Sequence, residues 1–367
     1  MDIFEATTKF ESWLARQACT VADDLEVKHG LMVESLGHFF RATYFRWSQA
    51  WPSVCAPVAR VPRVAAAGDL HVDSFGTWRD EDARLVWGVH DLGELWRLPF
   101  TQDLVRLAAS VRLAIEAGEV LLEPEIALAV LLDGYRAALE RGGEPFVLAE
   151  RHEHLAALVH ERVRNAGRFW RAVEGAVLSA RSDVPEVPRK ALVRALPRDA
   201  VIVGFGHRLG AIGSLGRHSY VVWGIWKGSL VGREACLAAP PTWAWTSKAA
   251  HPWTETLAAV RSGPARADDP SMSATPDGWV VRRIAPDCAR IELASLPSGR
   301  HDARLLGAMG FETANLHMAS RPGAELLAAL DALPVHWLRE CVDAMDEGMR
   351  HDWAQWCRQF RKSAPPA

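Results

Sequence analysis

Two short acidic segments contain residue types that could transfer a proton and hold a metal ion. The first, GDLHVDSFGTW at residues 68–78, follows the apolar run RVAAA and contains Asp69 and His71. The second contains Asp91 and follows the apolar run LVWGV. A positioned carboxylate can accept the proton of a substrate hydroxyl, and carboxylate oxygen is a ligand that Mg²⁺ prefers. Asp69 is therefore the candidate catalytic base, and Asp91 is the candidate metal ligand.

The first segment also fits a simple turn, in which an Asp side chain accepts hydrogen bonds from neighbouring amides. We expect His71 to support this loop through hydrogen bonds rather than to react. His71 and Asp73 form an HxD pair that could bind zinc, but no HExxH motif or third histidine completes such a site. A metal hydrolase built on Asp69, His71 and Asp91 consequently has little support.

A glycine-rich segment, HRLGAIGSLGRHSYVVW at residues 207–223, leads into an apolar run typical of a strand. Glycines expose backbone N–H groups without a Cβ in the way, so the chain can approach phosphate groups closely. The candidate phosphate-binding residues are Gly213, Ser214 and Gly216. A plain β-turn with left-handed glycines accounts for the same pattern. Only the combination with Asp69 and Asp91 favours a phosphate site.

The composition excludes several classes of protein. The 367 residues carry a net charge of −3, which gives no basic footprint for nucleic acid. No apolar run reaches the length of a membrane span, and the N-terminal MDIFEATTKFE lacks the apolar stretch of a secretory signal. The six cysteines include no CxxC pair, which argues against a zinc site and a disulfide framework. We expect a cytoplasmic protein whose partner is a small-molecule substrate or a nucleotide; its oligomeric state is not predicted.

The segments around these motifs predict an α+β protein. Apolar periodicity predicts helices over the first fifty residues, from Gln102 to about Leu178, and from residue 302 nearly to the C-terminus. Short strands are predicted before each acidic loop, and several more follow residue 199. The segment 261–278 is expected to be a flexible loop.

Prolines are expected to break the N-terminal helical pattern at Pro52, Pro57 and Pro62 and to form a linker, SDVPEVPRKAL, near residue 185. These breaks predict three regions of the chain. They are a helical lobe with the two acidic loops (1–185), a β-rich small lobe with the glycine loop (199–320), and C-terminal helices packed on the core (321–367).

The motifs together resemble a known signature. The segment GDLHVDSFGTWRDEDARLVWGVHDLGEL and the later DLVRLAAS resemble the bacterial domain-of-unknown-function 2252 family. GSLGR, VVRRIAPDCARIEL and LLGAMGFETANLH continue the resemblance in the same order, over most of residues 30 to 320. This family is distantly similar to protein-kinase-like folds, including the aminoglycoside phosphotransferases with their HGDLHxxN loop.

The resemblance implies a two-lobed kinase-like fold, with ATP and Mg²⁺ as cofactors. Because the acidic loops precede the glycine loop, it implies a circularly permuted order. Asp69 would be the base, Asp91 the main Mg²⁺ ligand and Ser74 an auxiliary ligand. Glu312 would correspond to the helix Glu that pairs with a strand lysine in the nucleotide site.

The sequence also departs from the family pattern in ways that weaken nucleotide or metal binding. The motif Asn is Ser74, a second acid is replaced by Gly93, and the first loop glycine is Ala211. The family lysine in REAK is Cys236, and a thiol carries no positive charge. Two other lysines, Lys227 and Lys248, are candidates to replace it.

Two functions follow from these observations. In the first, the protein is a kinase-like phosphotransferase that moves the ATP γ-phosphate to a small-molecule hydroxyl, with a partly degraded active site. In the second, it is a catalytically inactive, pseudokinase-like protein that binds a ligand or another protein through the same cleft. The retained acids favour the first function, and the four substitutions favour the second.

Overall fold

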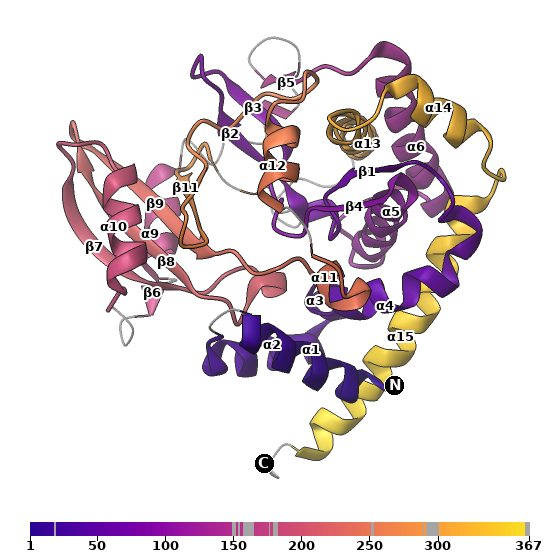
Figure 1. The fold of residues 1–367 in the computed structure, drawn as a ribbon, viewed down its shortest axis with the longest axis horizontal. Helices are drawn as coiled ribbons and strands as arrows, with labels where there is room; N and C mark the ends of the chain where they lie inside the picture. The colour runs from indigo at the N-terminus through magenta and orange to yellow at the C-terminus, as the bar shows by residue number, and fades with distance from the viewer. Residues whose placement is uncertain are drawn as a thin grey trace.

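The computed structural model describes residues 1–17, 20–148, 152, 155–156, 165–175, 177–178, 183–250, 253–288, 290 and 301–363. The protein is mixed α+β, as predicted, with a large helical part beside a sheet-rich part (Figure 1). Most of the buried apolar residues form one continuous core in the helical part. Smaller apolar clusters lie on the two faces of the sheet.

Four helices form the N-terminal region, as the apolar periodicity predicts: α1 (Ile3–Gln17), α2 (Ala22–Glu34), α3 (Leu36–Ala42) and α4 (Tyr44–Val54). Ser35 caps α3, because its side chain accepts a hydrogen bond from the His38 amide at 3.0 Å. The helical pattern breaks among the three prolines, as predicted, although α4 runs through Pro52 and ends at Val54. Pro57 lies in a short 3-10 helix, Ala56–Val58, and Pro62 precedes the strand that begins at Arg63. Pro52 removes one backbone hydrogen bond of α4. Only two residues of the helix follow it, so the loss is small.

The two acidic segments each follow a short strand, as predicted. Strand β1 (Arg63–Ala66) pairs with β4 (Trp96–Pro99). Strand β2 (Phe75–Arg79) forms a hairpin with β3 (Leu85–Val89), and β3 also pairs with β5 (Phe146–Val147). The Asp69 segment connects β1 to β2, and the Asp91 segment connects β3 to β4. Each segment therefore connects the same two small sheets, β1-β4 and β2-β3-β5.

The helical core is assembled around α5 (Phe100–Glu116), whose side chains are buried on nearly every side. The remaining helices of this part are α6 (Pro124–Arg141), α13 (Asp302–Met318), α14 (Gly323–Asp331) and α15 (Trp337–Ser363). Helices α6 and α13 pack backbone to backbone, because a Cβ on Gly134 would overlap the Gly307 carbonyl. Helix α13 thus belongs to the helical part, and the boundary predicted at residue 320 falls well beyond the last strand of the sheet.

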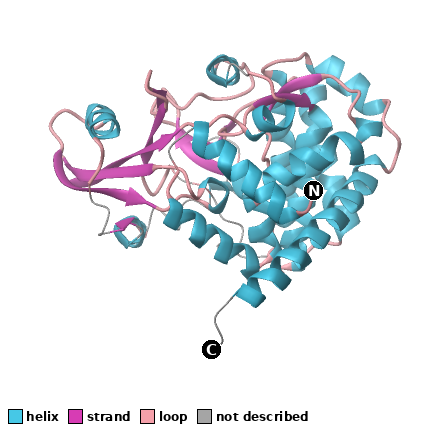
Figure 2. Ribbon diagram, turned by 60° about the horizontal axis from the view of Figure 1, so that its bottom comes forward, coloured by secondary structure: helices cyan, strands magenta, loops and turns pink. Residues whose placement is uncertain are grey.

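The sheet-rich part is a single antiparallel sheet in the order β10-β11-β9-β8-β7-β6. Figure 2 shows its long strands in magenta beside the cyan helices of the helical part. Its strands are β6 (Val177–Leu178), β7 (Val201–Arg208), β8 (Ser219–Trp226), β9 (Ser229–Leu237), β10 (Ser273–Ala274) and β11 (Trp279–Ile284). Val222 and Leu192 belong to the cluster on one face, while Val221 and Trp170 belong to the cluster on the other. Adjacent residues of a strand point to opposite faces, so β8 contributes to both.

Two helices cover this sheet, α9 (Ala166–Gly175) and α10 (Glu186–Ala195). The linker predicted near residue 185 is therefore wrong, because Pro185 precedes a helix and Pro188 lies in its first turn. Proline is tolerated there, since the first helical N–H groups have no partner within the helix. Helix predictions at 149–151, 153–154 and 157–164, and strand predictions between 291 and 296, fall outside the described residues.

The chain between β9 and β10 lies between the sheet and the helical part (Figure 1). It contains α11 (Thr242–Ser247) and α12 (Trp253–Arg261). The predicted flexible loop at 261–278 is instead held by ion pairs. Arg261 binds Asp268 at 2.6 Å, and Arg266 binds Glu312 of α13 at 2.8 Å.

Candidate functional site

Helix α5 fixes the backbone of the Asp69 loop through polar side chains on one of its faces. The Asp103 carboxylate accepts hydrogen bonds from the amides of Ala67 and Gly68, at 2.7 and 2.9 Å. Two turns later, the Ser110 hydroxyl accepts a hydrogen bond from the Val72 amide at 3.0 Å. Residues at these spacings share a helix face, so α5 holds the loop at both ends.

Arg106, on the same face of α5, binds Asp69 itself. Its Nε and Nη2 both donate to Asp69 Oδ1, at 2.9 and 2.7 Å. The guanidinium lies over the Phe40 ring, 3.4 Å from the centroid, and near Trp47. Burial raises the pKa of Asp69 to about 6, against the opposing effect of the Arg106 charge. A carboxyl with a pKa close to neutrality can exchange a proton at physiological pH.

The glycine loop lies directly over Asp69. A short 3-10 helix (Ile212–Ser214) brings Gly213 so close that its Cβ, if present, would lie 3.6 Å from Asp69 Oδ2. The end of the loop is fixed to α2, because the Val21 amide donates to the Gly216 carbonyl at 3.0 Å. Gly216 has a φ of +93°, a conformation that glycine adopts readily.

The second acidic segment contributes two carboxylates. Asp91 forms an ion pair with Arg290 and accepts a hydrogen bond from the Gly93 amide at 3.4 Å. Burial by itself would raise the pKa of Asp91, but Arg290 and other nearby positive charges hold it below its usual range. Glu94 accepts hydrogen bonds from Arg217 at 2.8 Å and from the Thr242 amide at 2.5 Å. Asp91 is therefore a carboxylate at neutral pH, and both acidic side chains face positively charged groups.

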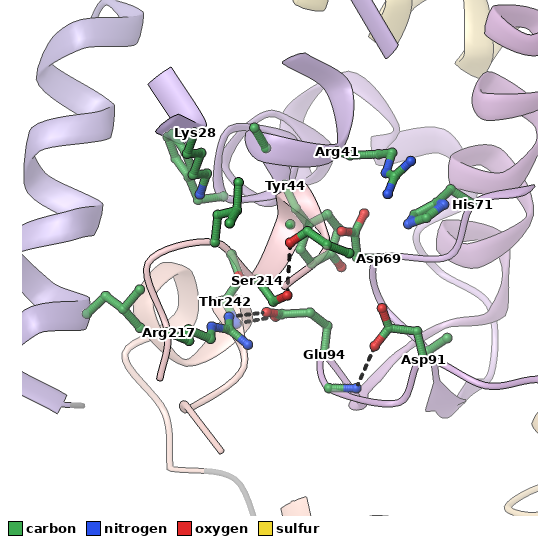
Figure 3. A pocket seen from close by; sticks show the side chains of 18 of the residues that line it. Lys28, Arg41, Tyr44, Asp69, His71, Asp91, Glu94, Ser214, Arg217 and Thr242 are labelled. Atoms are coloured by element: carbon green, nitrogen blue, oxygen red, sulfur yellow. Dashed lines mark hydrogen bonds and ion pairs between the residues drawn. The ribbon is translucent and has the colours of Figure 1, made fainter. Parts of the chain in front are cut away.

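These groups surround a narrow cavity with about 50 Å³ of free space. Figure 3 shows Lys28, Asp69, Asp91, Glu94 and Arg217 around it, contributed by α2, the two acidic loops and the glycine loop. Its charged lining consists of four basic side chains and three carboxylates: Lys28, Arg41, Arg217 and Arg290 against Asp69, Asp91 and Glu94. The lining thus presents charges of both signs, which could attract a cation and an anionic group.

A second pocket of about 120 Å³ adjoins the first. The two share Asp91, Gly93, Ser214, Arg217 and Arg290. Most of the other walls are apolar. Leu92 belongs to the Asp91 loop, and the rest come from β9, β11 and the chain between them: Leu237, Ala238, Ala239, Trp253, Met272 and Val280. An apolar pocket beside a charged one is a common arrangement for a ligand with a flat ring and an anionic tail.

Ser74, predicted as an auxiliary metal ligand, lies inside its own loop. The side chain is fully buried, accepts a hydrogen bond from the His71 amide at 3.0 Å and donates one to the Asp69 carbonyl at 3.3 Å. His71 Nδ1 accepts a hydrogen bond from the Asp73 amide at 3.2 Å, which agrees with the supporting role expected for His71. Burial holds the pKa of His71 well below its usual range, so the ring is neutral.

Glu312 is not among the residues that line either pocket. Its carboxylate lies beneath β3, where it accepts hydrogen bonds from Arg266 at 2.8 Å and from the Val89 amide at 3.1 Å. Cys236 does line the apolar pocket, and burial raises the pKa of its thiol. The structure therefore brings Cys236, but not Glu312, to the cleft.

The lysines predicted to replace the missing strand lysine lie elsewhere. Lys227 is exposed in the β8–β9 turn, with its ammonium 4.7 Å from the centroid of the Trp226 ring. Lys248 is exposed after α11. Neither lines either pocket.

Sequence reasoning missed two important side chains. Arg106 had a signal, because an arginine within the apolar helix segment DLVRLAAS has to be buried with a partner. Lys28 had none, because a lysine four residues after Asp24 is typical of a solvent-exposed helix face.

Comparison with known families gives one match. Residues 20–186 match the family described as an uncharacterized protein conserved in bacteria (DUF2252). The resemblance predicted from the motifs is thereby confirmed over this region, which contains both acidic loops and α5. No curated protein and no solved structure matches the chain.

The described residues contain neither a membrane-spanning helix nor a ready-made metal cluster. None of the helices there is long and apolar enough to cross a bilayer. Within the same residues, no cluster of three or more His, Cys, Asp or Glu side chains is arranged to hold a metal ion by itself.

Proposed function

We propose that the cleft binds ATP with Mg²⁺ and that the protein transfers the γ-phosphoryl group to a hydroxyl of a small molecule. One observation carries this proposal. The oxygen of the partly buried Asp69 carboxylate that Arg106 does not bind, Oδ2, faces the glycine loop at Gly213, in the same cavity as Asp91. A base, a phosphate-binding loop and a metal-binding carboxylate are the parts that phosphoryl transfer requires.

Asp69 is suited to the role of base. Arg106 holds Oδ1 through two hydrogen bonds, which fixes the carboxylate and leaves Oδ2 available to the cavity. With a pKa near 6, the group is ionised at neutral pH yet basic enough to take the proton of a hydroxyl as the phosphorus–oxygen bond forms. Arg106 is thus a positioning residue for Asp69.

The two pockets suggest how the nucleotide would lie. The apolar pocket beside Cys236 suits the base, and the charged cavity beneath Gly213 suits the phosphates. Because the cavity is narrow, we expect the glycine loop to move outward when the phosphates enter.

Asp91 is the residue that fits a metal ion. Mg²⁺ is usually held by one or two carboxylates together with substrate phosphates, so the lack of a larger cluster among the described residues does not oppose it. When bound, the ion would neutralise charge on the phosphates. Asp91 would exchange Arg290 for the cation, and we assign no metal role to the buried Ser74.

The strand order supports a kinase-like, circularly permuted arrangement. In protein kinases a glycine-rich loop covers the phosphates, and the phosphate-binding lysine is on the third strand. Here the glycine loop joins β7 to β8, and β9 is the third strand, with Cys236 near its end. The acidic loops precede this sheet in the chain, which is the order that a permuted kinase would have.

Calorimetric titration of the purified protein with ATP, with and without Mg²⁺, tests the proposal. Magnesium-dependent binding is the expected result. No binding, or binding indifferent to magnesium, would overturn it. A titration with adenosine alone would then show whether the apolar pocket binds the base without phosphates.

A non-catalytic, pseudokinase-like function is the alternative, and one observation favours it. Asp69 forms an ion pair with Arg106, and Asp91 forms one with Arg290. These arginines partly neutralise the charges that a base and a metal ligand would use. Under this alternative the protein binds ATP but does not transfer phosphate. Any slow release of phosphate would then be the same in Asp69→Asn as in the unmodified protein. A rate that falls at least about a hundredfold in Asp69→Asn, the usual contribution of a general base, excludes it.

A further inference from the structure

Helix α2 places a buried lysine in the charged cavity. Its inward face carries Asp24, Lys28 and Met32, one helical turn apart. Asp24 accepts a hydrogen bond from His207 of β7 at 2.9 Å, and both side chains are buried. Leu25 packs against Gly216 of the glycine loop. Lys28, one turn beyond Asp24, therefore has a fixed position at the base of this loop.

Lys28 lines the cavity although only 4% of its surface is exposed. Within the described residues its ammonium makes no hydrogen bond, and no carboxylate oxygen lies within 4 Å of it. Burial lowers the pKa of Lys28. A buried lysine without a partner is costly to ionise, so this position is explained best by an anion that is not part of the chain.

Each carboxylate that acts on Lys28 electrostatically already has another partner. Glu11 is bound by His29 at 2.8 Å, Glu94 by Arg217 at 2.8 Å, and Asp69 by Arg106 at 2.7 Å. These carboxylates attract Lys28 without satisfying its three N–H donors.

The other cations of the cavity differ from Lys28 in this respect. Arg41 binds Asp73 at 2.8 Å, Arg217 binds Glu94, and Arg290 binds Asp91. Among the basic residues that line the cavity, Lys28 alone lacks an ion pair within the described part of the chain.

We propose that Lys28 is the cation that binds the phosphates of ATP in this cleft, in place of the strand lysine that is absent at Cys236. This inference rests on the proposed nucleotide function. The charge thus comes from helix α2 in the N-terminal region rather than from β9. An ammonium close to Asp69 and Gly213 can donate hydrogen bonds to phosphate oxygens, and such charge-assisted bonds are stronger than neutral ones.

The test compares Lys28→Met with a matched control, Lys227→Met, in the full chain. Methionine nearly preserves the length of the side chain and removes the charge together with its three N–H donors. Lys227, in the exposed β8–β9 turn, loses the same charge outside the cleft. Calorimetric titrations with Mg²⁺–ATP and with adenosine separate the phosphate contribution from that of the base, because adenosine has no phosphates.

We expect Lys28→Met to weaken ATP binding by at least about tenfold, equal to about 1.4 kcal/mol. Adenosine binding should stay within about twofold, and Lys227→Met should leave both affinities within about twofold. ATP affinity in Lys28→Met equal to that of the control would overturn the assignment of Lys28. An equal loss for ATP and adenosine would overturn it too, because the lysine would then act on the shape of the cleft.

Thermal unfolding of each variant checks that the fold is intact, and Lys28→Gln replaces Lys28→Met if the latter does not fold. Failure of the proposed function gives a different result from failure of this inference. If the unmodified protein does not bind ATP, the proposed function and the assignment of Lys28 are both overturned. If the unmodified protein binds ATP and the Lys28 variants bind it equally well, only the inference about Lys28 falls.

Discussion

Arg106 donates two hydrogen bonds to the same oxygen of Asp69, at 2.9 and 2.7 Å, and so leaves the second oxygen on the cavity side. The guanidinium is almost fully buried and is stacked on Phe40. A buried arginine on a rigid helix gives a carboxylate a defined orientation, which a lysine could do less precisely because its ammonium lacks a planar fork of donors. The geometry of the candidate base therefore depends on α5 as much as on its own loop.

Arg106→Met should destabilise the protein strongly. It leaves Asp69 buried without its partner, and breaking a buried pair in this way typically costs about 3–5 kcal/mol. Arg136→Met is the control, because Arg136 and its partner Asp331 are both well exposed and such pairs contribute about 0–1 kcal/mol. Urea denaturation measures both variants. Similar losses of unfolding free energy in the two would show that the Arg106–Asp69 pair carries no special stability.

The raised pKa of Asp69 predicts how stability depends on pH. In the unfolded chain Asp69 releases its proton near pH 3.8, whereas in the folded protein it does so near pH 6. Between these values the folded state binds more protons, so the stability due to Asp69 falls as pH rises and then becomes constant above about pH 6. The difference in unfolding free energy between the unmodified protein and Asp69→Asn should therefore decrease from pH 4 to 7, by up to about 3 kcal/mol. Denaturation curves that stay parallel over this range would contradict the raised pKa.

Much of the fold could be predicted from the sequence because its signals are local. The hairpin of β2 and β3, the glycine that ends α6 at Gly142 and the strands β7 to β9 all follow from apolar period and turn residues. Pro52 and Pro188 both lie inside helices, which their residue type did not predict. A proline in the first turn removes no hydrogen bond of the helix, and one in the last turn removes a single bond. A proline alone therefore does not show where a helix ends.

The candidate site was predictable where residues lie close together in the sequence. Asp69, Asp91 and Gly213 could be found from their motifs, and the structure brings all three to one cavity. Lys28 could not, since only the packing of α2 on the glycine loop turns its face inward. The position of Glu312 could not be predicted for a related reason. Tertiary packing pairs it with Arg266, which lies far from it in the sequence.

Asp91→Asn should remove the effect of magnesium on ATP binding. The amide keeps the shape of the side chain but lacks the negative charge that attracts a divalent cation. Titrations of this variant should give the same ATP affinity with and without Mg²⁺, where the unmodified protein should show a difference of at least about tenfold. Asp82→Asn, in the exposed β2–β3 turn, should behave as the unmodified protein does. Magnesium dependence that survives in Asp91→Asn would assign the metal to another residue.

Gly68→Ala should be far more harmful than Gly118→Ala, although both glycines have a positive φ, +83° and +74°. An alanine in this conformation costs about 1–2 kcal/mol at either site. At Gly118 the new Cβ meets nothing within 4 Å, whereas at Gly68 it overlaps the Glu94 carbonyl oxygen and lies 3.1 Å from the Tyr44 hydroxyl. Since the carbonyl is backbone, the two acidic loops must separate to admit the methyl group, which should weaken ATP binding as well as folding. Urea denaturation and ATP titration of both variants measure these effects; equal losses of stability, with ATP affinity unchanged in Gly68→Ala, would show that the two loops do not depend on this contact.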